Sequence, residues 1–158
     1  MTTVEQVRAE RNLAQMAARR RIDERELERA ILNALGIHGL TQRRISEIVG
    51  GASHTTIHRL VHRLLENPDQ VQRITPAEVI DRRTAGMITD DEMMDQLMNW
   101  SYSFGYIPKM DGIATDAYIS GDWDDVEHAF YRDLLSDDEF THLMERQKSH
   151  LKRASRTR

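Results

Sequence analysis

The sequence predicts an all-α fold, in which an N-terminal three-helix unit precedes an acidic region of two helical hairpins. Apolar residues recur at helical spacing through most of the chain, and helix-capping residues stand in front of several of these segments. Charge divides the chain: residues 1–75 hold 12 arginines and 9 acidic residues, residues 76–145 hold 4 basic and 17 acidic residues, and residues 146–158 hold 6 basic residues and no acidic one. This asymmetry predicts separate partners for separate parts of the protein.

The composition of the 158 residues excludes several classes of protein. The chain has no cysteine, which rules out disulfides and thiolate metal sites. No apolar run approaches the roughly 20 residues of a membrane helix, and the opening residues do not form a secretory signal. We therefore expect a cytoplasmic protein with three parts: residues 1–70, the acidic residues 76–150, and a flexible basic tail at 151–158.

Residues 4–35 are predicted to be helical. Their strongest apolar stripe follows the i, i+3, i+4, i+7, i+8 pattern and consists of Leu27, Ala30, Ile31, Ala34 and Leu35. Asp23 could cap a second helix, with Glu26 three residues later as in a capping box. The sequence thus allows one long helix or two helices with a joint near Ile22. Gly36 and Gly39 end the helical segment.

Residues 41–65 have the pattern of two short helices around a glycine turn. Thr41 can cap the first, which carries Ile45, Ile48 and Val49, and the Gly50-Gly51-Ala52 segment breaks it. Ser53 can cap the second, whose expected apolar face is Ile57, Leu60, Val61, Leu64 and Leu65. Asn67-Pro68 is expected to end that helix.

This segment resembles the helix-turn-helix family of DNA-binding proteins. Ile45 and Ser46 supply the apolar and small positions of the first helix, Gly50 supplies the turn glycine, and Ile57 and Leu64 belong to the inward face of the second helix. The resemblance covers about 40 residues and implies a trihelical domain, with residues 27–35 as the earlier helix. The turn is one residue longer than the commonest pattern of the family.

The outward face of the second helix carries no acidic residue before Glu66, which suits the major groove of DNA. Because the N-terminal part of a recognition helix usually reaches the bases, we assign base readout to His54, Thr55, His58 and Arg59. Phosphate contact is assigned to Thr41, Gln42, Arg43, Arg44, Ser53 and Arg63, and His62 lies on the same outward face. The alternative is a helical hairpin that never meets DNA.

We predict no catalytic, cofactor or metal site. His54, His58 and His62 recur every four residues, but neither the glutamate of a hydrolytic zinc motif nor a cysteine accompanies them. The conspicuous carboxylates lie at expected helix starts, where the helix dipole accounts for them. The sequence also lacks a phosphate-cradling loop, so we expect no enzyme.

Two halves of the acidic region resemble each other at an offset of 47 residues. Residues 85–93 align with residues 132–140, and each half has the pattern of a helix, a short turn, two apolar residues and a capped helix. Pro76 suits the start of a helix, and Asp122 begins a further helical segment. We expect a pair of helical hairpins, with chance similarity between two capping boxes as the alternative.

The segment between these halves has an aromatic residue at every second position: Trp100, Tyr102, Phe104 and Tyr106. Strict alternation is typical of a strand with one apolar edge, which must be covered by the helices or by a partner. Both possibilities stay open, and we assign these four residues to partner binding.

The predicted function is that of a sequence-specific DNA-binding transcriptional regulator. A DNA-binding head followed by an acidic helical region resembles the layout of small bacterial or phage repressors and of antitoxins, which implies autoregulation and a basic protein partner such as a toxin. We also expect a homodimer, because one small domain neutralises few phosphates, and its possible contact surfaces are the alanine-rich N-terminal helix and the aromatic segment. One alternative is a helical adaptor or immunity-type protein that neutralises a basic partner without binding DNA. Another is a part of a transcription or recombination complex, resembling the DNA-binding ends of sigma factors or resolvases.

Overall fold

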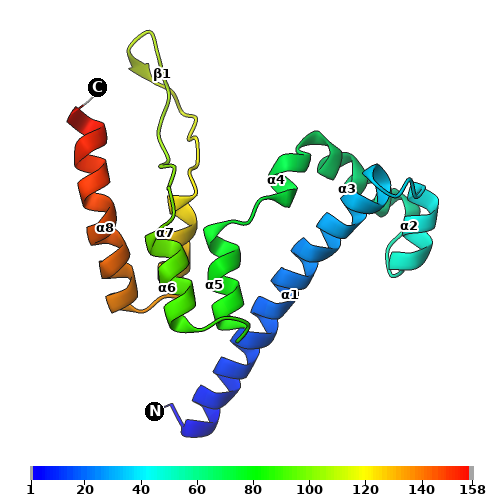
Figure 1. Cartoon of the computed structure of the whole chain (residues 1–158), viewed down its shortest axis with the longest axis horizontal. Coiled ribbons are helices and arrows are strands. Elements are labelled where there is room, and N and C mark those ends of the chain that lie inside the picture. Colours follow the sequence, from blue (N-terminus) through cyan, green and yellow to red (C-terminus); the bar gives the residue numbers. More distant parts are fainter. Residues whose placement is uncertain (1, 157–158) are drawn as a thin grey trace. The chain divides into compact units, whose positions relative to one another are not determined.

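The computed structural model describes residues 2–156, which are mainly helical, as the sequence predicts, with one small two-stranded hairpin that was not expected. The chain divides into two compact units, Arg19–Ile74 and a second formed by Met1–Ala18 with Thr75–Arg158. The helix α1 (Val4–Gly36) contributes residues to both units (Figure 1). The boundary after the first of these units lies between Ile74 and Thr75, and the first half of α1 belongs to the same unit as the acidic region. Within the described residues, no helix is long and apolar enough to cross a bilayer.

The helix α1 is one continuous helix, so the possible joint near Ile22 is not present. Residues 5–35 contain neither proline nor glycine, which leaves nothing to interrupt the backbone hydrogen bonds. The predicted apolar stripe is only partly right. Ile31 and Leu32 are buried, whereas Leu27 and Ala30 are exposed.

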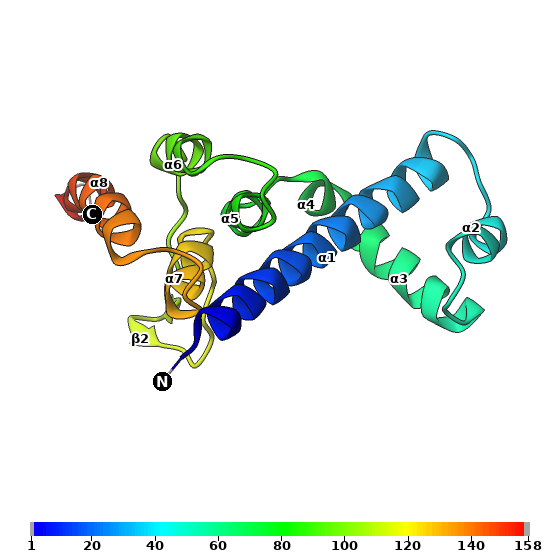
Figure 2. The same ribbon diagram turned by 90° about the horizontal axis from the view of Figure 1, so that it is seen from below.

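The unit Arg19–Ile74 combines the second half of α1 with α2 (Gln42–Val49), α3 (His54–Glu66) and α4 (Pro68–Gln72). Figure 2 shows α2 and α3 close to the C-terminal end of α1. Its core contains six buried residues from three helices: Ile31, Leu32, Ile45, Ile57, Val61 and Leu64. Because these residues come from α1, α2 and α3, burial of their side chains stabilises the three helices together.

The short helix α4 was missed in the sequence. Pro68 follows the end of α3 and also begins α4. Proline suits the first position of a helix because the N–H there has no partner within the helix. The side chain of Arg29 donates hydrogen bonds to the carbonyl oxygens of Val71, at 3.0 Å, and Arg73, at 3.1 Å. These bonds fasten α4 and the residue after it to α1, and the unit continues to Ile74.

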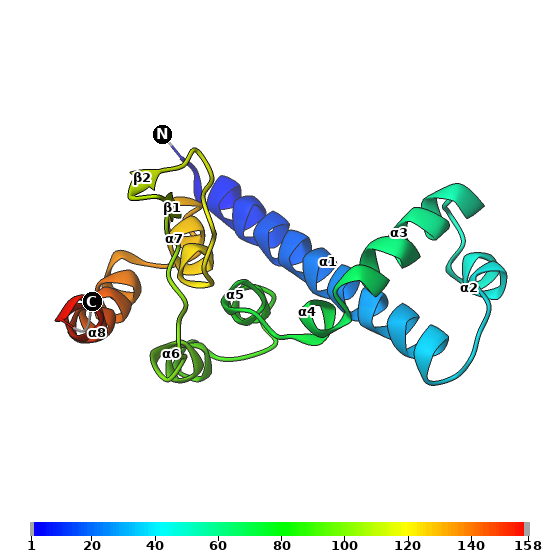
Figure 3. The same ribbon diagram turned by 90° about the horizontal axis from the view of Figure 1, so that it is seen from above.

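The other unit contains two helical hairpins, as the sequence predicts. The helices are α5 (Pro76–Thr84) with α6 (Asp90–Met98), and α7 (Trp123–Tyr131) with α8 (Asp137–Arg156). Figure 3 shows α5, α6 and α8 almost end-on, with α7 among them. The buried core draws on all four helices: Val79, Ile80, Met93, Leu97, Trp123, Val126, Ala129, Leu135 and Leu143. Ala18 of α1 is also buried.

The two hairpin turns repeat the same backbone geometry 47 residues apart. Met87 N donates to Arg82 O at 2.8 Å, and at the equivalent place Leu134 N donates to Ala129 O at 2.9 Å. The residue before each of these donors has a positive φ, 77° at Gly86 and 58° at Asp133. Capping boxes follow at the same offset, one at Thr89 and Glu92 and one at Ser136 and Glu139. The repeat in the sequence thus corresponds to a repeated structural motif.

The segment between the two hairpins contains β1 (Lys109–Met110), paired antiparallel with β2 (Ile113–Ala114). One further bridge joins Tyr106 and Ile119. Residues 100–104, for which alternation predicted a strand, belong to no strand. Their aromatic side chains pack on the core of this unit.

The helix α8 extends further than expected. It continues to Arg156, so residues 151–156 are helical where we predicted a flexible tail. Residues 157–158 of that predicted tail lie outside the described residues.

Candidate nucleic-acid interface

Two side-chain caps and a glycine turn determine the local structure of α2 and α3. The hydroxyl oxygen of Thr41 accepts from Arg44 N at 3.1 Å, and that of Ser53 accepts from Thr56 N at 3.2 Å. Both hydroxyl oxygens therefore act as N-caps. Their hydroxyl hydrogens can still donate to a phosphate. In the turn, Gly50 has φ 62° and ψ 178°, a conformation that almost only glycine adopts.

The second helix exposes the predicted side. Ile57, Val61 and Leu64 are buried, which leaves the opposite face of α3 to solvent. All the residues assigned to DNA contact are exposed except Gln42, which is half-buried. The prediction for Leu65 was wrong: this side chain is 54% exposed because it lies beside the buried stripe and not within it. Ile48 of α2 is exposed for the same reason.

His58 connects the two helices at this surface. Its Nδ1 atom lies 3.0 Å from Oε1 of Gln42, the first residue of α2. Its ring also stacks on that of His62, with centroids 6.3 Å apart and planes inclined by 18°. The structure thus brings together three of the predicted residues: His58, assigned to base readout, His62, placed on the same outward face, and Gln42, assigned to phosphate contact.

Three of the predicted arginines have acidic neighbours. Arg43 Nε and Arg44 Nη1 lie 3.6 Å and 3.2 Å from the carboxylate of Glu47. Arg63 Nη2 lies 2.7 Å from Glu28 Oε1, although the two residues are 35 positions apart. The three arginine side chains are exposed, although Glu28 is half-buried, so each pair adds little stability. They do reduce the positive charge that these arginines offer to a phosphate.

Arg59 differs from the other predicted arginines. It forms no ion pair or hydrogen bond with any residue that the structure describes, and it is exposed in the middle of α3. Thr55, one turn earlier, is exposed on the same face. A free guanidinium beside a threonine methyl and hydroxyl can donate two parallel hydrogen bonds to a guanine and contact a neighbouring base.

Sequence reasoning missed the two glutamates that neutralise this surface. Glu47 follows Arg43 and Arg44 by four and three residues, a spacing that indicates ion pairs on a helix. No local pattern could indicate Glu28, because packing of α3 beside α1 alone brings it to Arg63. The outer face of α3 has no acidic residue before Glu66, but Glu28 and Glu47 lie on the surrounding surface.

The histidines of α3 belong to no metal cluster in the described part of the chain. No group of three or more histidine, aspartate or glutamate side chains in residues 2–156 is placed to hold a metal ion.

Three of the four aromatics that we assigned to partner binding pack against the core. Trp100, Tyr102 and Phe104 are partly buried on it, whereas Tyr106 is 54% exposed. Trp100 Nε1 donates to Asp122 Oδ2 at 3.0 Å, and the Tyr102 hydroxyl donates to Leu97 O at 2.7 Å. The alternation left two possibilities open, cover by the protein's own helices or by a partner. For these three residues, the protein's own helices provide the cover.

Comparison with known proteins identifies no relative of this chain: no family model, no curated protein and no solved structure matches it.

Proposed function

We propose that residues 27–65 form a helix-turn-helix domain and that the protein is a sequence-specific DNA-binding transcriptional regulator. The observation that carries this proposal is the exposed face of α3 with Thr55 and Arg59, on which no carboxylate precedes Glu66 at the C-terminal end of the helix. In the proposed complex, this face enters the major groove, and Arg59 donates to guanine. Arg43, Arg44 and the N-terminus of α2 lie on the flanking phosphates.

The proposal includes a homodimer, because pairing on two half-sites raises the affinity of a small domain. The first half of α1 supports this part. Leu13 and Met16 are 67% and 63% exposed, and Ala9 and Ala17 are exposed beside them. At 100° per residue, these four positions fall within a sector of about 100°, as in a helix that packs on an equivalent helix. We therefore place the dimer contact on this face of α1 and not on the aromatic segment.

A basic protein partner, such as a toxin, remains part of the proposal for the acidic unit. Its support is limited to net charge, because many of the carboxylates cap helices or occupy their first turns. The alternative of an adaptor that never binds DNA gains no specific support from the aromatic segment, since three of its four rings contribute to the core.

The test begins with selection of bound sequences from a pool of random duplexes by the full chain. Binding of the selected duplex is then measured by fluorescence anisotropy at several salt concentrations. Arg59→Ala should weaken specific binding by about 1–3 kcal/mol and relax the preference at one base position. Arg132→Ala is the matched control, because Arg132 is exposed but lies in the acidic unit.

Two results would contradict the proposal. The first is absence of binding to every duplex at low salt, and the second is equal loss of affinity in the Arg59 and Arg132 variants. If DNA binding is absent but the protein retains a basic partner on affinity purification, the adaptor function replaces it.

A further inference from the structure

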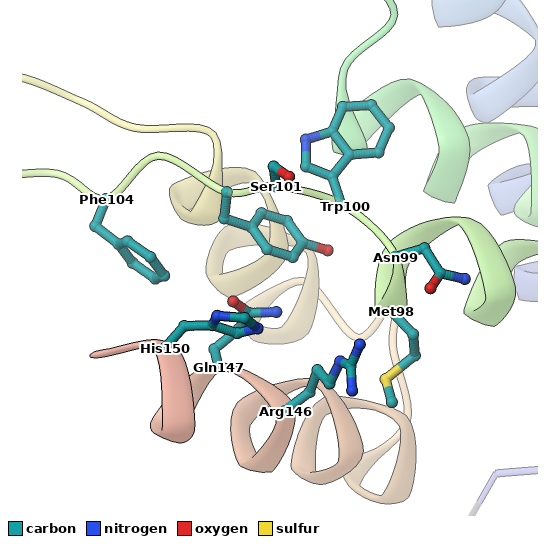
Figure 4. Close-up of a pocket in the computed structure, with 9 residues that line it drawn as sticks. Met98, Asn99, Trp100, Ser101, Phe104, Arg146, Gln147 and His150 are labelled. Carbon is teal, nitrogen blue, oxygen red and sulfur yellow. The ribbon is translucent and has the colours of Figure 1, made fainter. Parts of the chain in front are cut away.

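A pocket of about 310 Å³ lies between the segment after α6 and the C-terminal half of α8. Figure 4 shows Arg146, Gln147 and His150 projecting from α8 on the side that faces residues 98–104. Small-molecule sites in proteins begin near this volume. The pocket therefore has room for a compact ligand of one or two rings.

Aromatic residues form one wall of the pocket, namely Trp100, Tyr102 and Phe104; the Trp100 ring itself projects away from α8 (Figure 4). Contacts behind the wall fix these rings. Trp100 donates to Asp122, Tyr102 donates to Leu97 O, and the Phe104 ring lies 6.0 Å from that of Trp123. These contacts to the protein's own residues hold the wall in place, and it offers flat apolar surface to a ring.

The opposite wall is polar and contains an amide that lacks a partner. Gln147 is only 3% exposed, yet its side chain forms no hydrogen bond with the residues that the structure describes. The amide of Gln147 keeps access to solvent in the pocket, so its oxygen and nitrogen are available to hydrogen-bond a ligand. Arg146, on the same wall, likewise forms no ion pair or side-chain hydrogen bond within the described residues.

The charge of the pocket is opposite to that of its surroundings. Residues 76–145 hold 17 acidic and 4 basic residues, but none of the residues that line the pocket is acidic. Arg146 supplies a fixed positive charge, and His150 supplies an imidazole. A guanidinium presents two parallel donors, a geometry that matches a carboxylate.

We infer that this pocket binds a small planar aromatic carboxylate. The ligand ring lies against Tyr102 and Phe104, next to Trp100, the carboxylate binds Arg146, and the amide of Gln147 bonds to a polar atom of the ligand. The inference does not depend on DNA binding, because the pocket belongs to the acidic unit.

The experiment titrates 2-naphthoate into the full-length protein and records calorimetry together with ¹H–¹⁵N spectra. The chain has two tryptophans, and only Trp100 lines the pocket, so the indole N–H signals report the location of binding. Trp100→Phe assigns the two signals. We expect saturable binding that shifts the Trp100 signal more than the Trp123 signal. The neutral analogue 2-naphthalenemethanol should bind about tenfold more weakly, because it cannot form the charged pair.

Variants of the polar wall test the assigned roles. Arg146→Gln removes the charge and should weaken 2-naphthoate binding about tenfold while leaving binding of the neutral analogue unchanged. Gln147→Leu keeps a similar side-chain volume but removes the amide, so it should weaken binding of both ligands. Arg132→Gln is the matched control, an exposed arginine of the same unit outside the pocket. Circular dichroism of each variant checks that the fold is intact.

The inference is overturned if wild-type protein shows no saturable binding of 2-naphthoate in the millimolar range. It is also overturned if Arg146→Gln and Arg132→Gln bind it equally, or if the neutral analogue binds as tightly as the carboxylate. Each of these results leaves the DNA-binding proposal unaffected, since its test uses α3.

Discussion

Arg83 forms a two-pronged ion pair with Glu139, in which Nη1–Oε2 is 2.9 Å and Nη2–Oε1 is 3.2 Å. The pair joins the C-terminal end of α5 to the first turn of α8, and Nη2 also donates to Leu134 O at 2.7 Å. Glu139 Oε1 in turn accepts from Ser136 N in the second capping box. The two helical hairpins are therefore joined through Glu139, which also belongs to the capping box at the start of α8.

Removal of this pair should destabilise the acidic unit. The two side chains are only 19% and 17% exposed, so Arg83→Ala leaves Glu139 and the Leu134 carbonyl partly buried without their donor. We expect the free energy of unfolding to fall by about 1–3 kcal/mol, measured by urea denaturation. Arg83→Lys should recover only part of the loss, because an ammonium cannot form both bonds in the same geometry. Arg132→Ala, at an exposed position, should change stability by less than about 0.5 kcal/mol; an equal loss there would contradict the assigned role of Arg83.

The turn between α2 and α3 should not tolerate a side chain at Gly50. Its φ of 62° and ψ of 178° are unfavourable for any residue with a Cβ, although no neighbouring atom would meet that Cβ. Gly50→Ala should therefore cost about 1–3 kcal/mol in thermal or urea unfolding through backbone strain alone. Gly36→Ala is the control, since Gly36 lies at the end of α1 with open space and no positive φ. Equal stability of the two variants would show that the turn has another conformation in solution.

Glu28 should limit the affinity for DNA. In Glu28→Gln, the ion pair with Arg63 is lost, so the guanidinium becomes available to a phosphate and one negative charge disappears from the surface. We expect tighter binding and a slope of log K against log salt that is steeper by about 1. Glu24→Gln is the matched control, because Glu24 pairs with Arg20 on α1 at an exposed position. If both variants bind alike, net charge and not the Arg63 pair determines the change.

Tyr102 should make the protein sensitive to alkali. Burial, with a smaller contribution from the charge of Asp122, raises the pKa of the Tyr102 hydroxyl well above its usual value. The unfolded chain then loses this proton more readily than the folded chain, so the contribution to stability is complete below about pH 10 and is lost as pH rises above it. Wild-type stability should fall more steeply than that of Tyr102→Phe between neutral pH and strongly alkaline pH, measured by urea unfolding. Parallel pH profiles would contradict this prediction.

Much of the local structure could be predicted because its causes lie within a few residues. Thr41, Ser53, Thr89 and Ser136 cap helices as their positions in the sequence indicate, since each accepts from a backbone N–H three residues later. Helical spacing likewise identified the buried side of α3. The start of α4 was missed because a proline is compatible with both the end of one helix and the beginning of the next.

By itself, the sequence determined where most helices begin, which face of α3 is buried, and that one hairpin pattern occurs twice, because capping and periodicity act over about one turn of helix. Only the tertiary structure decided that Glu28 neutralises Arg63, that the aromatic segment packs on the protein's own core, and that Trp100 and Arg146 line one pocket. These partners are separated by 35 residues or more in the first and last cases. Contacts at such separation depend on which helix faces pack together, and local preferences of the chain do not specify that packing.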